Sequence, residues 1–171
     1  PDFSVVPGPT GPIPITVTGR YTEGELDLLA VFFTMLKILY SIGYLQFCEP
    51  LVKVLAPLRE GKDLHLTTIR NEQAYFACIS MLVKDVVLPI DFGLPPIYVV
   101  GDSHTLSSAW RTVSISGKPH LLRPYLVTGL KIWHLREESR FYPKRNFWSV
   151  IDKIPRGSTV ISLLGEIDCR E

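Results

Sequence analysis

Apolar residues recur at helical spacing near the start of the chain. They stand three or four positions apart, which places them on one face of a helix, at Leu26, Leu29, Phe33, Leu36, Leu39 and Tyr40. Thr22 and Glu25 precede this run with the three-residue spacing of a capping box, and Gly43 interrupts it. The pattern predicts an amphipathic helix that begins after Thr22 and ends before Gly43.

The apolar segment 26–45 is nearly long enough to cross a membrane. It contains Asp27 and Lys37, and charged side chains are costly inside a bilayer. We therefore expect a buried amphipathic helix here and no membrane span.

Two further helices are expected before the pattern changes. The first runs from 44 to about 59, with Pro50 at risk of kinking it and Pro57 near its end. The second runs from 68 to about 84 and presents an apolar face that includes Phe76 and Ile79.

This helical stretch is similar to the hairpins of tetratricopeptide-type and related α-solenoid proteins. The resemblance rests on an apolar helix ending in Leu39-Tyr40-Ser41-Ile42-Gly43-Tyr44, a partner helix reaching Leu55-Ala56-Pro57, and small residues at Ala74 and Ala77. It implies that the N-terminal helices bind a protein partner. The alternative is a helical cap that packs on the next domain.

The pattern becomes strand-like after Pro89. Two short apolar runs, 97–100 and 160–164, are each typical of a fully buried strand of a parallel sheet. Between them the sequence predicts a short helix over 105–110, a hairpin of strands 111–115 and 120–127, and a helix over 131–138. These elements predict an α/β fold with a partial, flavodoxin-like parallel sheet behind an N-terminal α-helical segment.

Three regions follow from these patterns. Residues 1–20 are rich in proline, which blocks helix formation, so an extended arm or linker is expected there. Helical hairpins occupy 21–90, and the α/β region occupies 91–171. Because the chain lacks an initiator Met and stops just after an apolar run, we expect the α/β region to be truncated.

The amino-acid composition indicates the class of protein, its partners and its compartment. The 171 residues are 46% hydrophobic and 20% charged, which is a globular composition. Lys and Arg number 18 against 17 Asp and Glu, so a nucleic-acid partner is not expected, although basic and aromatic residues alternate over 123–156. The three cysteines are far apart in the sequence and odd in number, which favours a reducing compartment and a cytoplasmic protein.

Polar residues follow both predicted buried strands. Gly101-Asp102-Ser103-His104 comes after the first and Gly165-Glu166-Ile167-Asp168 after the second. Ligands of open α/β sheets bind beyond the carboxyl ends of the strands, and a serine on such a turn is well placed to act as a nucleophile.

In these residues the chain resembles the SGNH, or GDSL-type, hydrolase family over roughly 96–171. The family's first block is a strand followed by Gly-Asp-Ser, matched at Gly101, Asp102 and Ser103, and its second block is a glycine, matched by Gly129. The resemblance implies that Ser103 is the nucleophile of an ester or acetyl hydrolase. It also implies that the backbone N–H groups of Ser103 and Gly129 bind the oxyanion.

Two features depart from the family. Its third block ends in Gly-x-Asn-Asp, and Ile167 stands where the family has the Asn that completes the oxyanion hole. Loss of such a donor costs about 3–4 kcal/mol of transition-state stabilisation. The family's Asp-x-x-His, which supplies the general base, has no match in this sequence, so the base is expected from outside this chain.

For the remaining candidate residues, a structural role is an alternative to the functional one. His104, adjacent to Ser103, is expected in the pocket as a substrate contact rather than as a base. Ser103 can instead cap the next helix while Asp102 accepts N–H groups of the turn. His134 is a candidate general base, and the alternative is a packed or solvated histidine.

Acidic and basic groups near the C-terminus extend the predicted pocket. They are Glu166, Asp168 and Arg170, which bind a polar ligand or form an ion-pair network with Arg111 or Arg123. No group of His, Cys and carboxylate residues has metal-ligand spacing, so neither a metal nor a cofactor is expected.

The sequence therefore predicts a serine acyl hydrolase that acts on a small ester or acetylated substrate. The rival prediction is a non-catalytic interaction or scaffold protein, in which the α/β region keeps the fold without the chemistry. A third prediction is a pocket that binds a polar ligand without turnover.

Overall fold

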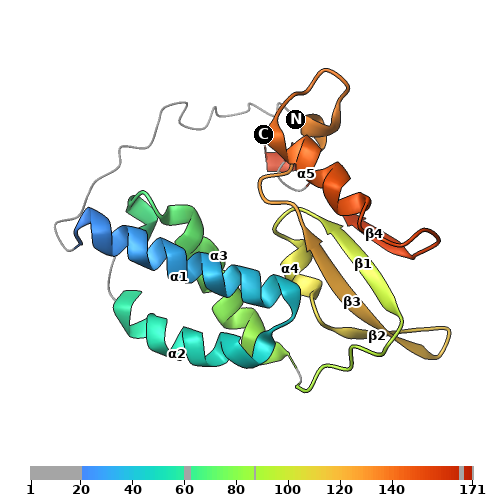
Figure 1. The fold of residues 1–171 in the computed structure, drawn as a ribbon, viewed down its shortest axis with the longest axis horizontal. Coiled ribbons are helices and arrows are strands. Elements are labelled where there is room, and N and C mark those ends of the chain that lie inside the picture. The colour runs from blue at the N-terminus through green and yellow to red at the C-terminus, as the bar shows by residue number, and fades with distance from the viewer. Residues whose placement is uncertain (1–20, 60–62, 87, 166–167, 171) are drawn as a thin grey trace, which may run out of the picture.

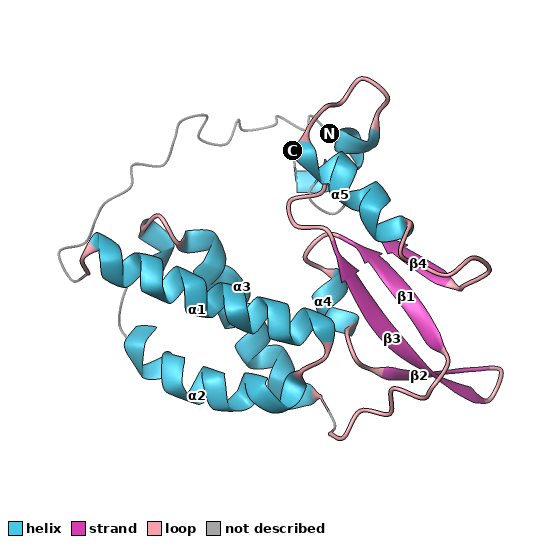
Figure 2. Ribbon diagram, viewed as in Figure 1, coloured by secondary structure: helices cyan, strands magenta, loops and turns pink. Residues whose placement is uncertain are grey.

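The computed structural model describes residues 21–59, 63–86, 88–165 and 168–170. A helical part is followed by a small sheet with its own short helices, which is a mixed α/β architecture (Figures 1 and 2). This agrees with the predicted α/β class. The predicted arm at 1–20 lies outside the described residues.

Three helices form the N-terminal part: α1 (Glu23–Ile42), α2 (Cys48–Arg59) and α3 (Arg70–Leu82). The predicted capping box is confirmed, because the Thr22 hydroxyl accepts the N–H of Glu25 at 3.3 Å and the Glu25 carboxylate accepts the N–H of Thr22 at 2.7 Å. Gly43 ends α1 with φ of 87°, a left-handed conformation that glycine adopts readily.

Replacing Thr22 by alanine should lower the free energy of unfolding by about 1 kcal/mol, because α1 loses its N-terminal cap. Urea unfolding followed by circular dichroism measures this. Thr68→Ala is the matched control, since Thr68 is an exposed threonine outside the helices. Equal stability of the two variants would contradict the capping role.

The predicted start of the second helix is wrong. The second helix begins at Cys48 rather than at 44, so Pro50 falls in its first turn. A proline there removes no intrahelical hydrogen bond, because the N–H groups of the first turn have no acceptor within the helix.

The sheet has four strands in the order β2-β3-β1-β4: β1 (Pro96–Gly101), β2 (Thr112–Ile115), β3 (Lys118–Leu126) and β4 (Val160–Leu163). β1 pairs in parallel with β3 and with β4, whereas β2 and β3 form the predicted antiparallel hairpin. The buried parallel strand predicted at 97–100 is confirmed. The chain passes from β1 to β3 on one side of β1 and then to β4 on the other, so the strand order reverses at β1 (Figure 1).

The prediction of a second fully buried strand is wrong. β4 lies at an edge of the sheet and pairs only with β1. Val160 and Ile161 are consequently 42% and 41% exposed. An apolar run does not distinguish an edge strand from a central one, because the pairing partners are set by the whole fold.

The helix predicted over 131–138 is also wrong, since only one 3-10 turn forms, at Ile132–Leu135. The next two carbonyl groups, of Arg136 and Glu137, accept hydrogen bonds from the Lys144 ammonium at 2.6 and 2.9 Å. In a continuing helix these two carbonyl groups would accept backbone N–H groups, and here they accept the Lys144 ammonium instead.

Two short helices complete the second part: α4 (Thr105–Ser108) and α5 (Tyr142–Ile151). α4 is shorter than the predicted helix at 105–110. The sequence pattern did not predict α5, although Pro143 near its start and the spacing of Phe147, Val150 and Ile151 are helical signals.

Among the described residues, those that are buried and hydrophobic form three clusters, and the largest joins the helices to the sheet. This largest cluster combines residues of α1, α2 and α3, such as Phe33 and Phe76, with Leu106, Trp110 and Leu121 from beyond β1. The Trp110 indole donates to the Tyr40 carbonyl at 2.6 Å, and the Tyr40 hydroxyl donates to the Leu106 carbonyl at 3.3 Å. The C-terminal end of α1 is thus tied to the segment that follows Ser103.

Candidate functional site

The turn after β1 begins at Gly101, a position where the surrounding backbone leaves no room for a side chain. The ideal Cβ of a residue at 101 would overlap the carbonyl oxygen of Leu163 on β4. Glycine lets the two backbones come together, and the N–H of Asp102 donates to the same carbonyl at 3.3 Å. Gly101 therefore allows β4 to approach the strand that carries the site.

Asp102 organises this turn. Its side chain is buried, and Oδ1 accepts the backbone N–H of His104 at 2.9 Å, as predicted for a turn carboxylate. The same oxygen lies 2.6 Å from Nδ1 of His104. Among the described residues, Oδ2 of Asp102 has no hydrogen-bond partner.

Ser103 does not cap the following helix, so that predicted alternative is wrong. α4 starts after His104 and has no side-chain cap. The Ser103 side chain instead lies near that of Tyr75, a residue of α3, and acts to lower the pKa of the Tyr75 hydroxyl.

Thr128 joins the same group. Gly101 of β1 is paired with Leu126 of β3, so Ser103 and Thr128 each lie two residues beyond the paired ends of adjacent parallel strands. The Thr128 side chain also lies near Tyr75 and acts on the Tyr75 pKa in the same direction as Ser103. Ser103 and Thr128 therefore follow the carboxyl ends of adjacent strands, and Tyr75 of α3 lies near both.

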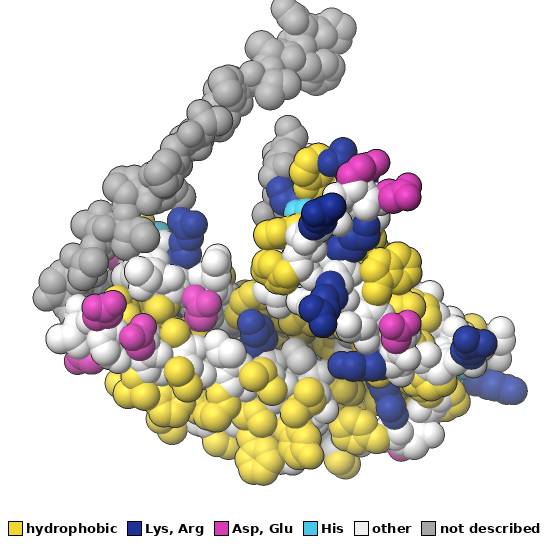
Figure 3. All heavy atoms as spheres, turned by 45° about the horizontal axis from the view of Figure 1, so that its top comes forward, with side chains coloured by type: hydrophobic (Ala, Val, Ile, Leu, Met, Phe, Trp, Pro, Cys, Tyr) yellow, Lys and Arg dark blue, Asp and Glu magenta, His cyan; other side chains and the backbone are white. Residues whose placement is uncertain are grey.

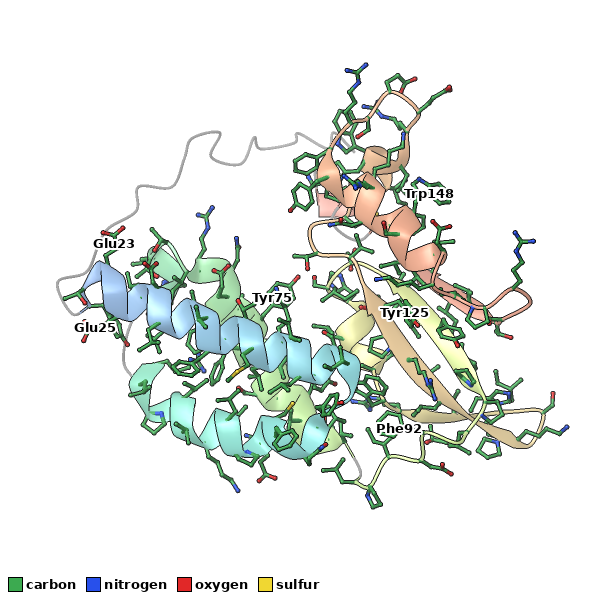
Figure 4. The ribbon with its side chains drawn as sticks, viewed as in Figure 1. Glu23, Glu25, Tyr75, Phe92, Tyr125 and Trp148 are labelled. Carbon is green, nitrogen blue, oxygen red and sulfur yellow. The ribbon has the colours of Figure 1, made fainter. Side chains whose placement is uncertain are left out.

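The surroundings of Tyr75 favour the neutral phenol. Burial raises the pKa of Tyr75 above its ordinary value of 10.0, and the nearby Asp102 carboxylate raises it further, whereas the neighbouring Thr128 and Ser103 side chains oppose the rise. Lys37 of α1 places its ammonium 4.6 Å from the centre of the Tyr75 ring. Figure 4 shows Tyr75 among the helices of the N-terminal part, which thus contribute directly to the site.

Gly129 follows Thr128 and lies in the turn beyond β3, with φ of 71° in the left-handed region. The N–H of Val127 donates to the Gly101 carbonyl at 2.7 Å, so the chain leading to Gly129 stays attached to the end of β1. The predicted nucleophile and the predicted second oxyanion donor therefore lie in neighbouring segments at the same sheet edge.

Asp168 has a structural role. Its carboxylate accepts the N–H groups of Ile132 at 2.8 Å and Trp133 at 3.2 Å, which lie at the start of the 3-10 turn. The predicted ion-pair network is not found for this residue, because Arg111 pairs with Asp85 at 3.6 Å and Arg123 donates to the Phe92 carbonyl at 2.7 Å. Glu166 and the side chain of Arg170 lie outside the described residues.

The bonds to Asp168 predict a dependence of stability on pH. Desolvation alone would raise the pKa of Asp168, but the N–H donors of Ile132 and Trp133 outweigh it and hold the pKa below the ordinary 3.8. A depressed carboxyl pKa stabilises the folded state fully above the unfolded-state pKa, and the stabilisation is lost as the pH falls through the folded-state pKa.

We therefore expect Asp168→Asn to be less stable than the wild type at pH 7, with a difference that shrinks below about pH 4. Urea midpoints measured from pH 7 to pH 2.5 test this. Asp152→Asn, at an exposed aspartate after α5, is the control. A difference that stays constant with pH would contradict the role of the Asp168 charge.

His134 is a packed histidine. It is buried, its Nδ1 accepts the N–H of Lys131 at 3.1 Å, and its ring centre lies 4.8 Å from that of Phe141. These contacts agree with the structural alternative rather than with the role of a base.

Sequence reasoning missed Tyr75 and Thr128. Nothing local marks Tyr75, which lies in a helix of mixed composition about thirty residues before the serine. Within the described residues, no group of three or more His, Cys, Asp or Glu side chains is arranged to hold a metal ion. Nor does any described helix combine the length and apolar character needed to cross a membrane.

Comparison with known proteins adds no assignment. No protein-family model, curated protein or solved structure matches the chain.

Proposed function

We propose that the chain carries the nucleophile of an SGNH-like serine acyl hydrolase, with Ser103 attacking a small ester or acetylated substrate. The observation that carries the proposal is the position of Ser103 on the turn that follows the buried parallel strand β1. Ligands of open α/β sheets bind beyond the strand carboxyl ends where the strand order reverses, and here it reverses at β1.

The order of the parallel strands supports the same proposal. β3, β1 and β4 are parallel and lie side by side in that order. The first three strands of flavodoxin-like sheets have this order, with the first strand in the middle. A partial flavodoxin-like sheet is therefore our proposal for the fold around Ser103.

The proposed reaction is acyl transfer. Oγ of Ser103 bonds to the acyl carbon, the carbonyl π electrons move to the oxygen, and the Oγ proton passes to a general base. The resemblance gives that role to the histidine of an Asp-x-x-His motif, which the printed sequence lacks. The C–O bond to the alcohol then breaks, the alcohol takes up the proton, and water hydrolyses the acyl-serine to the free acid.

A protein partner for the N-terminal helices is a second proposal, favoured by a separate observation. α1 exposes a line of large apolar side chains spaced alternately three and four residues apart, at Leu28, Val31, Met35, Ile38 and Ile42. Figure 3 shows hydrophobic side chains gathered over the helical part of the molecule. Exposed apolar faces of this kind mark protein contacts, as expected for an interaction or scaffold protein.

Release of p-nitrophenol from p-nitrophenyl acetate tests the hydrolase proposal on the longest natural form of the protein. We expect an initial burst of p-nitrophenol equal in amount to the protein, because each molecule acylates one serine. The absence of any burst or turnover above the buffer rate would contradict the proposal and leave the interaction protein as the function that the structure supports.

A further inference from the structure

Asp102 and His104 form a hydrogen-bonded pair that the proposed attack of Ser103 does not use. Nδ1 of His104 lies 2.6 Å from Oδ1 of Asp102. The Asp102 side chain is 1% exposed, whereas that of His104 is 42% exposed. A buried carboxylate behind a partly exposed imidazole is the arrangement by which serine hydrolases orient a catalytic histidine.

The pair sets the tautomer of the His104 ring. An ionised carboxylate only accepts hydrogen bonds, so the ring hydrogen is on Nδ1, where Oδ1 of Asp102 accepts it. In a neutral imidazole the other nitrogen then carries the lone pair. Nε2 is therefore the proton acceptor of this ring, on a side chain that solvent reaches.

Backbone hydrogen bonds fix the turn that carries the pair. The Asp102 N–H donates to the Leu163 carbonyl at 3.3 Å, and Oδ1 of Asp102 also accepts the N–H of His104 at 2.9 Å. The Asp102 carbonyl accepts the N–H and the hydroxyl of Thr105 at 3.1 and 2.9 Å. The turn therefore holds the His104 ring in position before a substrate binds, which lowers the entropic cost of the reaction.

His104 follows Ser103 directly on this turn. Both residues come after the end of β1, where ligands of open α/β sheets bind. Consecutive side chains in a helical turn do not face each other, so Nε2 of His104 is better placed for a water than for Oγ of Ser103. The water that hydrolyses an acyl-serine approaches from solvent, to which the His104 side chain is exposed.

We propose that His104, oriented by Asp102, is the general base of the deacylation step. This inference rests on the proposed acyl hydrolase function. Nε2 takes a proton from water as the water oxygen bonds to the acyl carbon and the carbonyl π electrons move to the oxygen. When those electrons return, the C–Oγ bond breaks, the imidazolium gives its proton to Oγ, and the free acid leaves. Asp102 is a positioning residue, since it acts through His104.

The test separates acylation from deacylation in the longest natural form of the protein. With p-nitrophenyl acetate, the burst of p-nitrophenol measures acylation and the steady rate that follows measures deacylation. We expect His104→Gln to keep the burst, to lower the steady rate about 10²–10⁴-fold, and to accumulate an acetyl adduct visible by intact mass. Asp102→Asn should likewise keep the burst and lower the steady rate, because the Asn amide does not impose the same tautomer.

The matched control is His120→Gln. His120 lies on β3, and its Nδ1 is 2.9 Å from the Lys118 carbonyl oxygen rather than from a carboxylate. Its replacement should leave both the burst and the steady rate within about twofold of the wild type.

Added imidazole distinguishes a base from a structural residue. We expect imidazole to speed the loss of the acetyl group from purified acetyl His104→Ala, because it supplies the missing acceptor. A folded His104→Gln protein with the wild-type steady rate, one that also loses the burst, or an acetyl His104→Ala that imidazole leaves unchanged overturns the inference, while acetylation of Ser103 in the wild type still upholds the hydrolase. A wild type that forms no acetyl-serine overturns the proposed function and this inference with it.

Discussion

Replacing Ser103 by alanine should lower kcat/KM for p-nitrophenyl acetate at least about 10³-fold, to the rate of non-specific hydrolysis. Alanine lacks the Oγ that bonds to the acyl carbon, and no neighbouring group can take over this step from the same position. The neighbouring Tyr75 side chain is a phenol whose pKa burial raises, and Thr128 is an ordinary alcohol. Neither is activated as a nucleophile.

The matched control for this prediction is Ser107→Ala, four residues further along the chain. Ser107 is exposed on α4, and its hydroxyl donates to the His104 carbonyl at 2.7 Å rather than facing Tyr75. Its replacement should leave kcat/KM within about twofold of the wild type. Equal activity of Ser103→Ala and Ser107→Ala would show that any hydrolysis arises elsewhere on the surface.

The second large effect is on the fold itself. Gly101→Ala should lower the free energy of unfolding by more than about 4 kcal/mol, which is a large part of the stability of a typical domain. The added Cβ overlaps the Leu163 carbonyl, and the overlapping atoms are backbone on both sides, so no side chain can rotate away. β4 must then separate from β1 at the turn that carries Asp102 and Ser103.

Urea unfolding measures this loss, and hydrogen exchange of the β4 amides locates it. Gly24→Ala is the control, because a Cβ at this exposed position of α1 meets nothing within 4 Å. It should stabilise the protein by about 0.5–1 kcal/mol, the ordinary gain of alanine over glycine in a helix. Wild-type stability of Gly101→Ala would contradict the close approach of β1 and β4.

The sequence predicted the elements whose signals are local. The Thr22 and Glu25 pair predicts its own hydrogen bonds, because all the atoms involved lie within one helical turn. Ser116 and Gly117 likewise form the turn of the predicted hairpin, both with positive φ. Such contacts depend on short spacings that can be read directly from the sequence.

The predictions that failed concern features set by contacts between residues that are far apart in the sequence. The exposure of β4 depends on which strands lie beside it, and the end of the turn at Leu135 depends on the Lys144 ammonium. The role predicted for Asp168 in the pocket failed for the same reason. Its carboxylate accepts the N–H groups of Ile132 and Trp133, which lie 36 and 35 residues away along the chain.

The candidate site was predicted in part. The motif placed Asp102 and Ser103 on the turn after a buried parallel strand, which the structure confirms. Tyr75 could not be predicted, because its position at Ser103 results from the packing of α3 through Phe76 and Ile79. A residue that reaches a site by tertiary packing leaves no pattern near the motif.

Covalent labelling of Ser103 by a fluorophosphonate, read as the intact mass of the longest natural form of the protein, tests the central claim most directly. The account predicts one adduct per molecule, absent from Ser103→Ala. A correctly folded wild type that gains no adduct, or an adduct that persists in Ser103→Ala, would contradict it.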